Sequence, residues 1–133
     1  MNELQQVQLS ILQEMDRVCR KNGIRYYLFS GTLLGAVRHQ GFIPWDDDID
    51  VVLLRDEYER FVNLPQEEFG PNFFLQTSDS DAEYCNVYAK LRRSDTTYME
   101  SYMDHKHINH GVFIDVFPLD GVPSNRFLQA LFW

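Results

Sequence analysis

The sequence predicts a mixed α/β (α+β) domain in which a β-sheet is flanked by helices. Apolar residues recur at helical spacing through residues 3–22, which is typical of an amphipathic helix. The second half of the chain holds short apolar runs between Gly and Pro, and one segment alternates strictly between apolar and polar residues. With 133 residues, we expect 1–133 to form one domain around a single core.

The first half of the chain predicts three helices and two strands. In order, we expect a helix over 3–22, a buried strand over 24–29, a helix over 32–39, a loop over 41–45, a strand over 48–54 and a helix from Asp56 to before Pro65. Asn22-Gly23 ends the first helix, because Gly adopts the left-handed conformation of a helix cap. Pro65 ends the third helix, because the residue before a proline avoids the helical region.

The second half predicts strands. They cover 73–76, 84–92 and 112–117, and the segment 78–81 is a polar surface loop. In the segment 84–92 the apolar residues, which we expect to face the core, are Cys85, Val87, Ala89 and Leu91. The alternate positions include Lys90 and Arg92, so we expect one core face and one polar face.

Composition and charge exclude several classes of protein. A formal charge of −8 disfavours nucleic acid as the main partner, because binding its phosphates needs clustered Lys and Arg. The sequence has no apolar run of about 20 residues that would span a membrane, and its first residues do not resemble a signal peptide. We therefore expect a cytoplasmic protein, with the inner face of the membrane as an alternative location. Cys19 and Cys85 lie in apolar patterns, which predicts reduced core thiols.

The apolar segment 127–133 has no polar residues after it. A helix this apolar should bury a face against a further element. We expect that the natural protein is longer, or that this segment contacts a membrane or a partner.

The most informative segment reads Asp-Asp-Asp-Ile-Asp at 46–50 and continues into an apolar strand. Side chains two residues apart share a face of a strand, so Asp48 and Asp50 are placed to bind the same divalent metal. One alternative is a solvated acidic loop. Another alternative is an EF-hand calcium loop. Its ligand spacing fits Asp46, Asp48, Asp50 and Glu57, but Val51 occupies the position where that loop needs Gly.

Asp115 lies within an apolar strand, where an ionised side chain is costly unless it is paired or metal-bound. With Asp48 and Asp50 it would complete a carboxylate cluster for Mg²⁺ or Mn²⁺, as phosphoryl and nucleotidyl transfer require. A structural ion pair with Lys90 or Arg92 is the alternative.

Ser30-Gly31-Thr32 follows a predicted strand and begins a helix, which is a typical anion site. Arg38, Lys90 and Arg92 are further candidates to bind phosphate, with ordinary surface ion pairs as the alternative. The sequence also contains loosely spaced histidines in a polar segment, which we interpret as loop residues: His105, His107 and His110.

Together these residues resemble a known family. The layout of helix, strand, Gly-Thr helix, Asp-Ile-Asp strand and a later strand aspartate is similar to the nucleotidyltransferase superfold. Within it, the segments 27–39 and 41–50 resemble the LicD family of phosphocholine transferases, and so do 90–92 and 111–121. Members of that family are typically longer, so the resemblance also implies that the carboxyl-terminal part of the protein is missing from this chain.

The resemblance implies a phosphotransferase that needs Mg²⁺ or Mn²⁺. It would transfer phosphocholine, or a related phospho-alcohol, from a CDP-linked donor such as CDP-choline to a hydroxyl of a glycan acceptor, a teichoic acid or lipopolysaccharide precursor, and release CMP. The acceptor or the carboxyl-terminal segment would bring the protein to the membrane. Alternatives are a nucleotidyltransferase that releases pyrophosphate from an NTP, and a non-catalytic nucleotide-binding fragment.

The resemblance also implies roles for individual residues. Asp48, Asp50 and Asp115 would be metal ligands, with Asp115 also a candidate base, and Gly31 with Thr32 would hold phosphate. If the donor carries choline, we expect a box of aromatic rings around its cation. The candidates for that box, which the core could equally use, are Trp45, Tyr26, Tyr27 and Tyr88.

Overall fold

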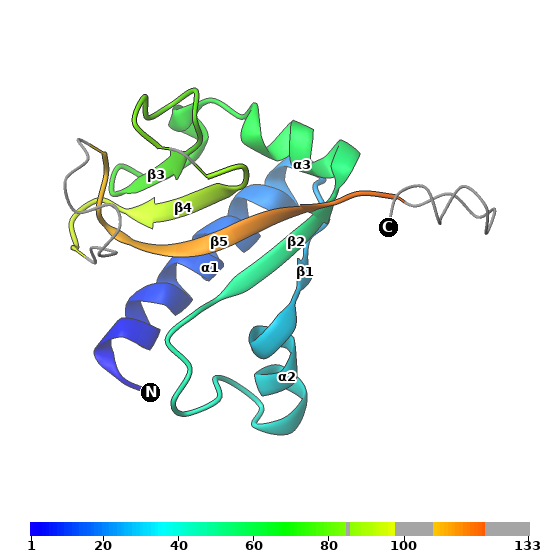
Figure 1. Ribbon diagram of the computed structural model, residues 1–133, viewed down its shortest axis with the longest axis vertical. Helices are drawn as coiled ribbons and strands as arrows, with labels where there is room; N and C mark the ends of the chain where they lie inside the picture. The colour runs from blue at the N-terminus through cyan, green and yellow to red at the C-terminus, as the bar shows by residue number, and fades with distance from the viewer. Residues whose placement is uncertain (85, 98–107, 122–133) are drawn as a thin grey trace.

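Five strands form one mixed sheet in the computed structural model, which describes residues 1–84, 86–97 and 108–121 (Figure 1). The strands are β1 (Tyr27–Leu28), β2 (Asp50–Leu54), β3 (Phe73–Gln76), β4 (Ala89–Arg93) and β5 (Val112–Leu119). Their order in the sheet is β1-β2-β5-β4-β3, with β2 and β5 parallel and the other neighbours antiparallel. The predicted α+β class is confirmed.

Three helices accompany the sheet: α1 (Glu3–Asn22), α2 (Ser30–Arg38) and α3 (Arg55–Val62). A short 3-10 turn covers Gln66–Glu68. Helix α1 lies behind the sheet in Figure 1 and packs against β4 and β5, while α3 packs against β2 and β5. Among the described residues, no helix is long and apolar enough to cross a membrane.

The two faces of the sheet differ because side chains alternate along each strand. The apolar core residues of the strands point toward α1 and α3. They include Val51, Leu53, Leu75, Leu91, Ile114 and Val116. They pack with Ile11, Met15 and Phe61 from the helices. The intervening residues of β2, β4 and β5, among them Asp50, Lys90 and Asp115, share the opposite face. The chemistry predicted from the sequence therefore lies on the sheet face away from α1.

Helix α1 begins and ends where the sequence predicts. Asn2 caps its first turn by accepting a hydrogen bond from the Gln5 amide, and the Gln5 side chain accepts one from the Asn2 amide. Gly23 ends the helix with a φ of 64°. Cys19 on this helix is a buried thiol, and burial raises its pKa to about 12, as expected of a reduced core residue.

Three predicted strands are shorter in the structure than the sequence predicts. The strand predicted over 48–54 begins at Asp50, so Asp48 lies in the loop before β2 and not on a strand face beside Asp50. Only Tyr27–Leu28 of the segment 24–29 pairs with β2. Strand β4 begins at Ala89 rather than at Tyr84, and Val87 is 94% exposed instead of facing the core. An alternating segment forms a strand only where a neighbouring strand provides hydrogen bonds. The pairing of β4 with β3 begins at Lys90 and its pairing with β5 begins at Ala89, so the residues before Ala89 have no strand neighbour among the described residues.

The predicted polar face of β4 is also buried. Lys90 and Arg92 are each 1% exposed, because both cations lie over the ring of Phe113 on β5. Several predictions concern residues outside the described ranges, namely those for Cys85, His105, His107 and the segment 127–133.

Glu14 links α1 to the start of β3. Its carboxylate is 9% exposed and accepts hydrogen bonds from Arg17 and from the Gly70 amide. The hydrogen bond from Arg17, helped by that from Gly70, lowers the pKa of Glu14 below its usual 4.5, against the opposing effect of burial.

Replacing Glu14 with Ala is expected to lower the free energy of unfolding by about 1–3 kcal/mol, because the Gly70 amide loses its acceptor. A depressed carboxyl pKa contributes stability above its unfolded value, so the difference from wild type should shrink as the pH falls below 4.5. Chemical denaturation across pH measures this. The exposed Glu67→Ala is the matched control, and an equal loss in both variants would contradict the prediction.

Candidate active site

Asp50 and Asp115 lie side by side on the sheet face that points away from α1 and α3, which we call the open sheet face. They are register partners on the parallel strands β2 and β5, which are about 4.8 Å apart in such a pair. The Asp115 amide donates a hydrogen bond of 3.0 Å to the Ile49 carbonyl, which fixes the register. Two carboxylates far apart in the sequence are thereby brought together.

Burial and neighbouring carboxylates raise the pKa of Asp50 and of Asp48. Burial, followed by the charges of Asp115 and Asp48 and by a side-chain hydrogen bond with Asp115, raises the pKa of Asp50 to about 6. Burial and the charges of Asp47 and Asp115 also raise the pKa of Asp48. Like charges this close are unfavourable unless a cation offsets them.

Lys90 supplies one such cation. Its Nζ lies 2.7 Å from Asp115 Oδ1, and the side chains are 1% and 14% exposed. The alternative of an ion pair between Lys90 and Asp115 is therefore confirmed, and it coexists with the contact between Asp115 and Asp50. One lysine faces three negative side chains, so the cluster keeps a net negative charge.

Arg92 lies one position further along the same face of β4. It donates hydrogen bonds to Gln76 Oε1 (2.7 Å) and the Gly111 carbonyl (2.6 Å). These contacts connect β4 with β3 and with the residue before β5. Both Lys90 and Arg92, predicted as phosphate ligands, thus already contact protein groups, and their role toward phosphate stays a prediction.

The loop before β2 gathers further carboxylates. Oxygens of Asp46, Asp47 and Asp48 lie within 4.8 Å of one another, and Asp46 Oδ1 accepts a hydrogen bond from the Asp48 amide. Within the described ranges, the predicted trio of Asp48, Asp50 and Asp115 does not form so tight a group. Asp46 and Asp47 are not among the site residues predicted above, although the uninterrupted run of three aspartates is a signal for such a cluster.

Two buried glutamines hold this loop. Gln5 Nε2 donates to the Asp46 carbonyl (2.8 Å), and Gln8 Nε2 donates to the Asp47 carbonyl. Both side chains come from α1 and are 2% and 3% exposed. Sequence reasoning missed them, although two amides on the apolar side of an amphipathic helix were a signal of buried hydrogen bonds.

The predicted phosphate cradle lies beside the carboxylates. Helix α2 begins at Ser30, which has a φ of 56°, and within the described residues no side chain caps its first turn. Thr32 Oγ1 accepts a hydrogen bond from the Asp50 amide (2.8 Å) and donates one to the Asp48 carbonyl (3.2 Å). A Cβ on Gly31 would lie 2.7 Å from Asp46 Oδ2, so glycine is needed here for the approach of a carboxylate.

Arg38 is not close to this first turn. It is the last residue of α2 and is exposed. Seven residues of helix place it about 10 Å along the axis from Gly31. The EF-hand alternative is wrong, because Val51 lies in β2 and Glu57 in α3, where it pairs with Arg60.

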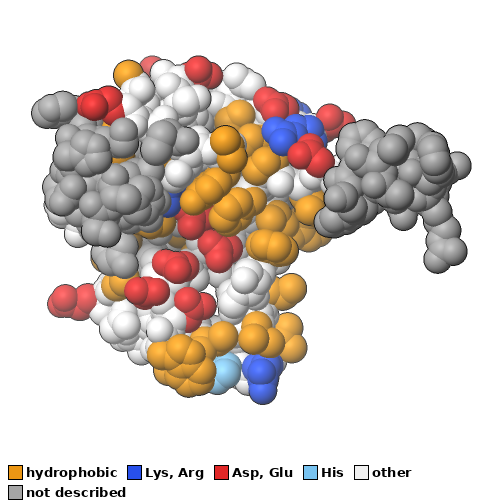
Figure 2. Space-filling view, in the orientation of Figure 1, with side chains coloured by type: hydrophobic (Ala, Val, Ile, Leu, Met, Phe, Trp, Pro, Cys, Tyr) orange, Lys and Arg blue, Asp and Glu red, His pale blue; other side chains and the backbone are white. Residues whose placement is uncertain are grey.

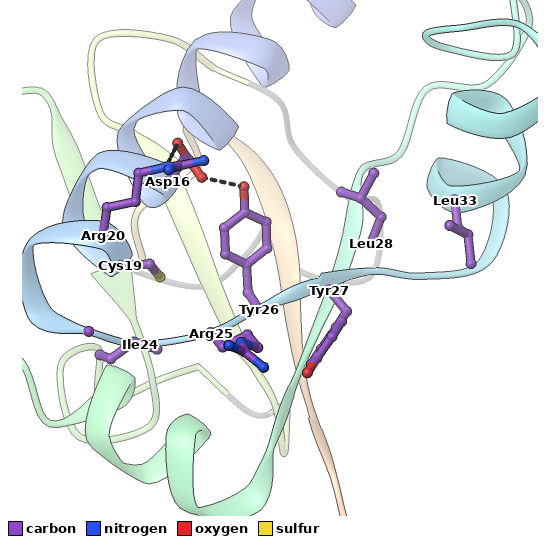
Figure 3. A pocket seen from close by; sticks show the side chains of 10 residues that line it. Asp16, Cys19, Arg20, Ile24, Arg25, Tyr26, Tyr27, Leu28 and Leu33 are labelled. Carbon is purple, nitrogen blue, oxygen red and sulfur yellow. Dashed lines mark hydrogen bonds and ion pairs between the residues drawn. The ribbon is translucent and has the colours of Figure 1, made fainter.

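The residues predicted for an aromatic box do not lie together. Trp45 is 81% exposed with its ring edge toward His39, and the Tyr26 hydroxyl donates to Asp16. Tyr26 and Tyr27 line a cavity of about 850 Å³ between the end of α1 and β1 (Figure 3). Of the aromatic residues predicted for the box, Tyr88 lies on the open sheet face, where its ring contacts that of Phe117.

Gly35 allows α2 to pack against the loop that leads to the aspartates. A Cβ at this position would lie 2.5 Å from the Gly41 carbonyl oxygen and 2.9 Å from the Ile43 amide nitrogen. Gly35→Ala is therefore expected to destabilise the fold by about 1–3 kcal/mol. Gly41→Ala, where a Cβ meets no atom within 4 Å, is the control for thermal unfolding. Equal melting temperatures for the two variants would refute the prediction.

Comparisons with known proteins agree with this arrangement. Residues 23–129 match the family model described as LicD/FKTN/FKRP, nucleotidyltransferase domain. The chain is 42% identical over 125 residues to the lipopolysaccharide cholinephosphotransferase LicD of Haemophilus influenzae, covering 93% of this chain and 46% of that protein. It is 34% identical to an uncharacterized protein of Rickettsia prowazekii, covering 88% of this chain and 40% of that protein.

A more distant relative is the human ribitol 5-phosphate transferase FKRP, at 28% identity over 63% of this chain and 20% of that protein. The chain thus spans less than half the length of the curated relatives named here. The match to the family model includes α2, the acidic loop and all five strands. The chain belongs to the LicD/FKTN/FKRP nucleotidyltransferase-domain family.

Proposed function

We propose that the protein transfers a phospho-alcohol, with phosphocholine the first candidate, from a CDP-linked donor to a hydroxyl of a cell-surface glycan precursor. Family membership supports this proposal, as do relatives whose names describe transfer of phosphocholine and of ribitol 5-phosphate. The structural observation that carries it is the pairing of Asp50 with Asp115 beside the first turn of α2.

A divalent metal, Mg²⁺ or Mn²⁺, is part of the proposal. The carboxylates fit such an ion, because burial and their mutual charges raise the pKa of Asp48 and Asp50 and the single cation of Lys90 does not balance them. Asp48, Asp50 and Asp115 are the residues that would hold it. When bound, the ion would offset negative charge on the reacting phosphate.

The chain's own groups would orient the reaction. Amides in the first turn of α2, at Gly31 and Thr32, would bind the donor's phosphate oxygens at the positive end of the helix dipole. The acceptor hydroxyl would attack the phosphorus that carries the alcohol, and the bond to CMP would break in line. Asp115, held by Lys90, would accept the hydroxyl proton.

The acceptor in this proposal is a precursor of lipopolysaccharide or teichoic acid, which would place the reaction at the inner face of the membrane. The word lipopolysaccharide in the name of the Haemophilus influenzae relative favours the first of these.

A second candidate is nucleotidyl transfer, which the description of the family's domain favours. Such an enzyme would attack the inner phosphorus of an NTP and release pyrophosphate. The leaving group distinguishes the two reactions.

The test incubates the full-length gene product with Mg²⁺, a glycan acceptor fraction and either CDP-choline, CDP-ribitol or CTP. Release of CMP from a CDP-alcohol, with the alcohol phosphate appearing on the acceptor, is the expected result. Pyrophosphate release from CTP would favour the second candidate. Metal-dependent binding of CDP-choline without any turnover would show a binding module instead.

A further inference from the structure

Three aromatic rings form a group on the open sheet face, which we call the aromatic ledge: Phe29, Tyr88 and Phe117. The ring centroids of Tyr88 and Phe117 are 4.4 Å apart, and those of Phe29 and Phe117 are 6.5 Å apart at 61°. Phe29 is the residue between β1 and α2, Tyr88 is the residue before β4, and Phe117 lies in β5. Segments distant in the sequence thus converge on one apolar surface.

The aromatic ledge lies directly beside the carboxylate pair. Phe117 follows Asp115 by two residues on β5, which places both side chains on one face about 6.6 Å apart along the strand. The Phe29 amide donates a hydrogen bond of 3.0 Å to the Asp50 carbonyl, so Phe29 lies next to Asp50 across the sheet. Figure 2 shows apolar side chains bordering acidic ones on this face.

The ledge is exposed where the core is not. Phe29 is 47% exposed and Phe117 is partly exposed, whereas the apolar residues toward α1 are buried. Lys90 Nζ lies 5.5 Å from the centroid of the Tyr88 ring, at one end of the ledge. Phe29 and Phe117 form the other end, where a cationic ligand would be further from this lysine. Exposed aromatic faces attract an organic cation through their ring electrons.

We propose that the aromatic ledge binds the alcohol part of the donor and selects a quaternary ammonium group. This inference rests on the proposed function and adds the residues that select the alcohol of the donor. A choline ammonium is two carbons from the phosphate ester oxygen, so a donor phosphate bound beside Asp115 would leave the ammonium on the side of Phe117, the next residue on that strand face. A neutral polyol such as ribitol would instead need hydrogen-bonding groups, which phenyl rings do not supply.

The test compares two donors that differ in one atom type. CDP-choline carries a trimethylammonium group, and CDP-3,3-dimethylbutanol carries the uncharged carbon group of the same shape. Wild-type protein is expected to prefer CDP-choline by about tenfold in kcat/KM, the size of a desolvated cation–π contact. Phe117→Leu and Phe29→Leu keep apolar volume but remove a ring, and each should bring this ratio close to one.

Trp45→Leu removes an exposed ring outside the ledge and should leave the ratio unchanged. If both donors react but the ratio is the same in wild type and in the two Phe variants, the ledge proposal fails while the proposed function stands. If neither donor reacts, the proposed function fails and the ledge proposal with it. If inhibition by CMP weakens in the Phe variants by as much as kcat/KM for CDP-choline falls, the ledge binds the nucleotide and the proposal is overturned. Because Phe29 is half exposed, its variant should fold even if Phe117→Leu does not.

Discussion

Replacing Asp50 with Asn is expected to abolish phospho-alcohol transfer while leaving the fold intact. Asn has the same shape, but it removes the negative charge that Asp50 adds to the cluster with Asp48 and Asp115. Loss of a preorganised electrostatic group of this kind lowers kcat by about 100- to 1,000-fold. CMP release from a CDP-alcohol measures the rate, and circular dichroism reports the fold.

The matched control is Asp79→Asn, which changes the same group on an exposed loop and should keep full activity. Because removing a repulsive carboxylate relieves strain among like charges, Asp50→Asn should unfold at the same temperature as wild type or higher. Turnover within tenfold of wild type in this variant would rule out the proposed role of Asp50.

The second large effect is expected at the ion pair between Lys90 and Asp115. Lys90→Met should lower the free energy of unfolding by about 3 kcal/mol, because it leaves a mostly buried carboxylate next to Asp50 without its cation. Urea denaturation measures the change. Adding Asp115→Leu to Lys90→Met should recover most of the stability, since an apolar pair of similar volume replaces the ion pair.

Lys21→Met provides the comparison. It removes an ion pair with Glu68 whose lysine is 60% exposed, and it should cost less than about 1 kcal/mol. The double variant at Lys90 and Asp115 should remain inactive although it is stable, because the carboxylate is gone. A stable and fully active double variant would show that Asp115 supports only the fold.

Part of this architecture follows from the sequence alone. Helix α1 could be predicted from end to end, because an amphipathic repeat, a capping residue and a terminal glycine all agree. The placement of Asp50 and Asp115 on one face could also be predicted, since Asp50 begins an apolar strand and Asp115 interrupts another, where a lone charge is costly.

Other features depend on partners that one segment does not reveal. Alternation in the segment 84–92 suggested a long strand, but only Ala89–Arg93 finds hydrogen-bonding neighbours. Lys90 and Arg92 looked like solvent-facing cations, and only the tertiary structure places Phe113, Asp115 and Gln76 around them.

The glutamines that hold the acidic loop show the same limit. Gln5 and Gln8 donate to carbonyls more than thirty residues away, and neither residue type nor spacing on α1 indicates that distant loop. The aromatic ledge likewise joins Phe29 with Phe117, whereas the sequence favoured tyrosines and Trp45. Local patterns predict which residues are unusual, and long-range contacts decide what surrounds them.

The most direct test of the central claim is a calorimetric titration with Mg²⁺, and with Mn²⁺, of the wild-type protein and of the Asp50→Asn and Asp115→Asn variants. If these carboxylates hold the metal, wild type should bind it and each variant should bind it at least about tenfold more weakly, with the fold unchanged by circular dichroism. Equal metal affinity in all three proteins would contradict the account.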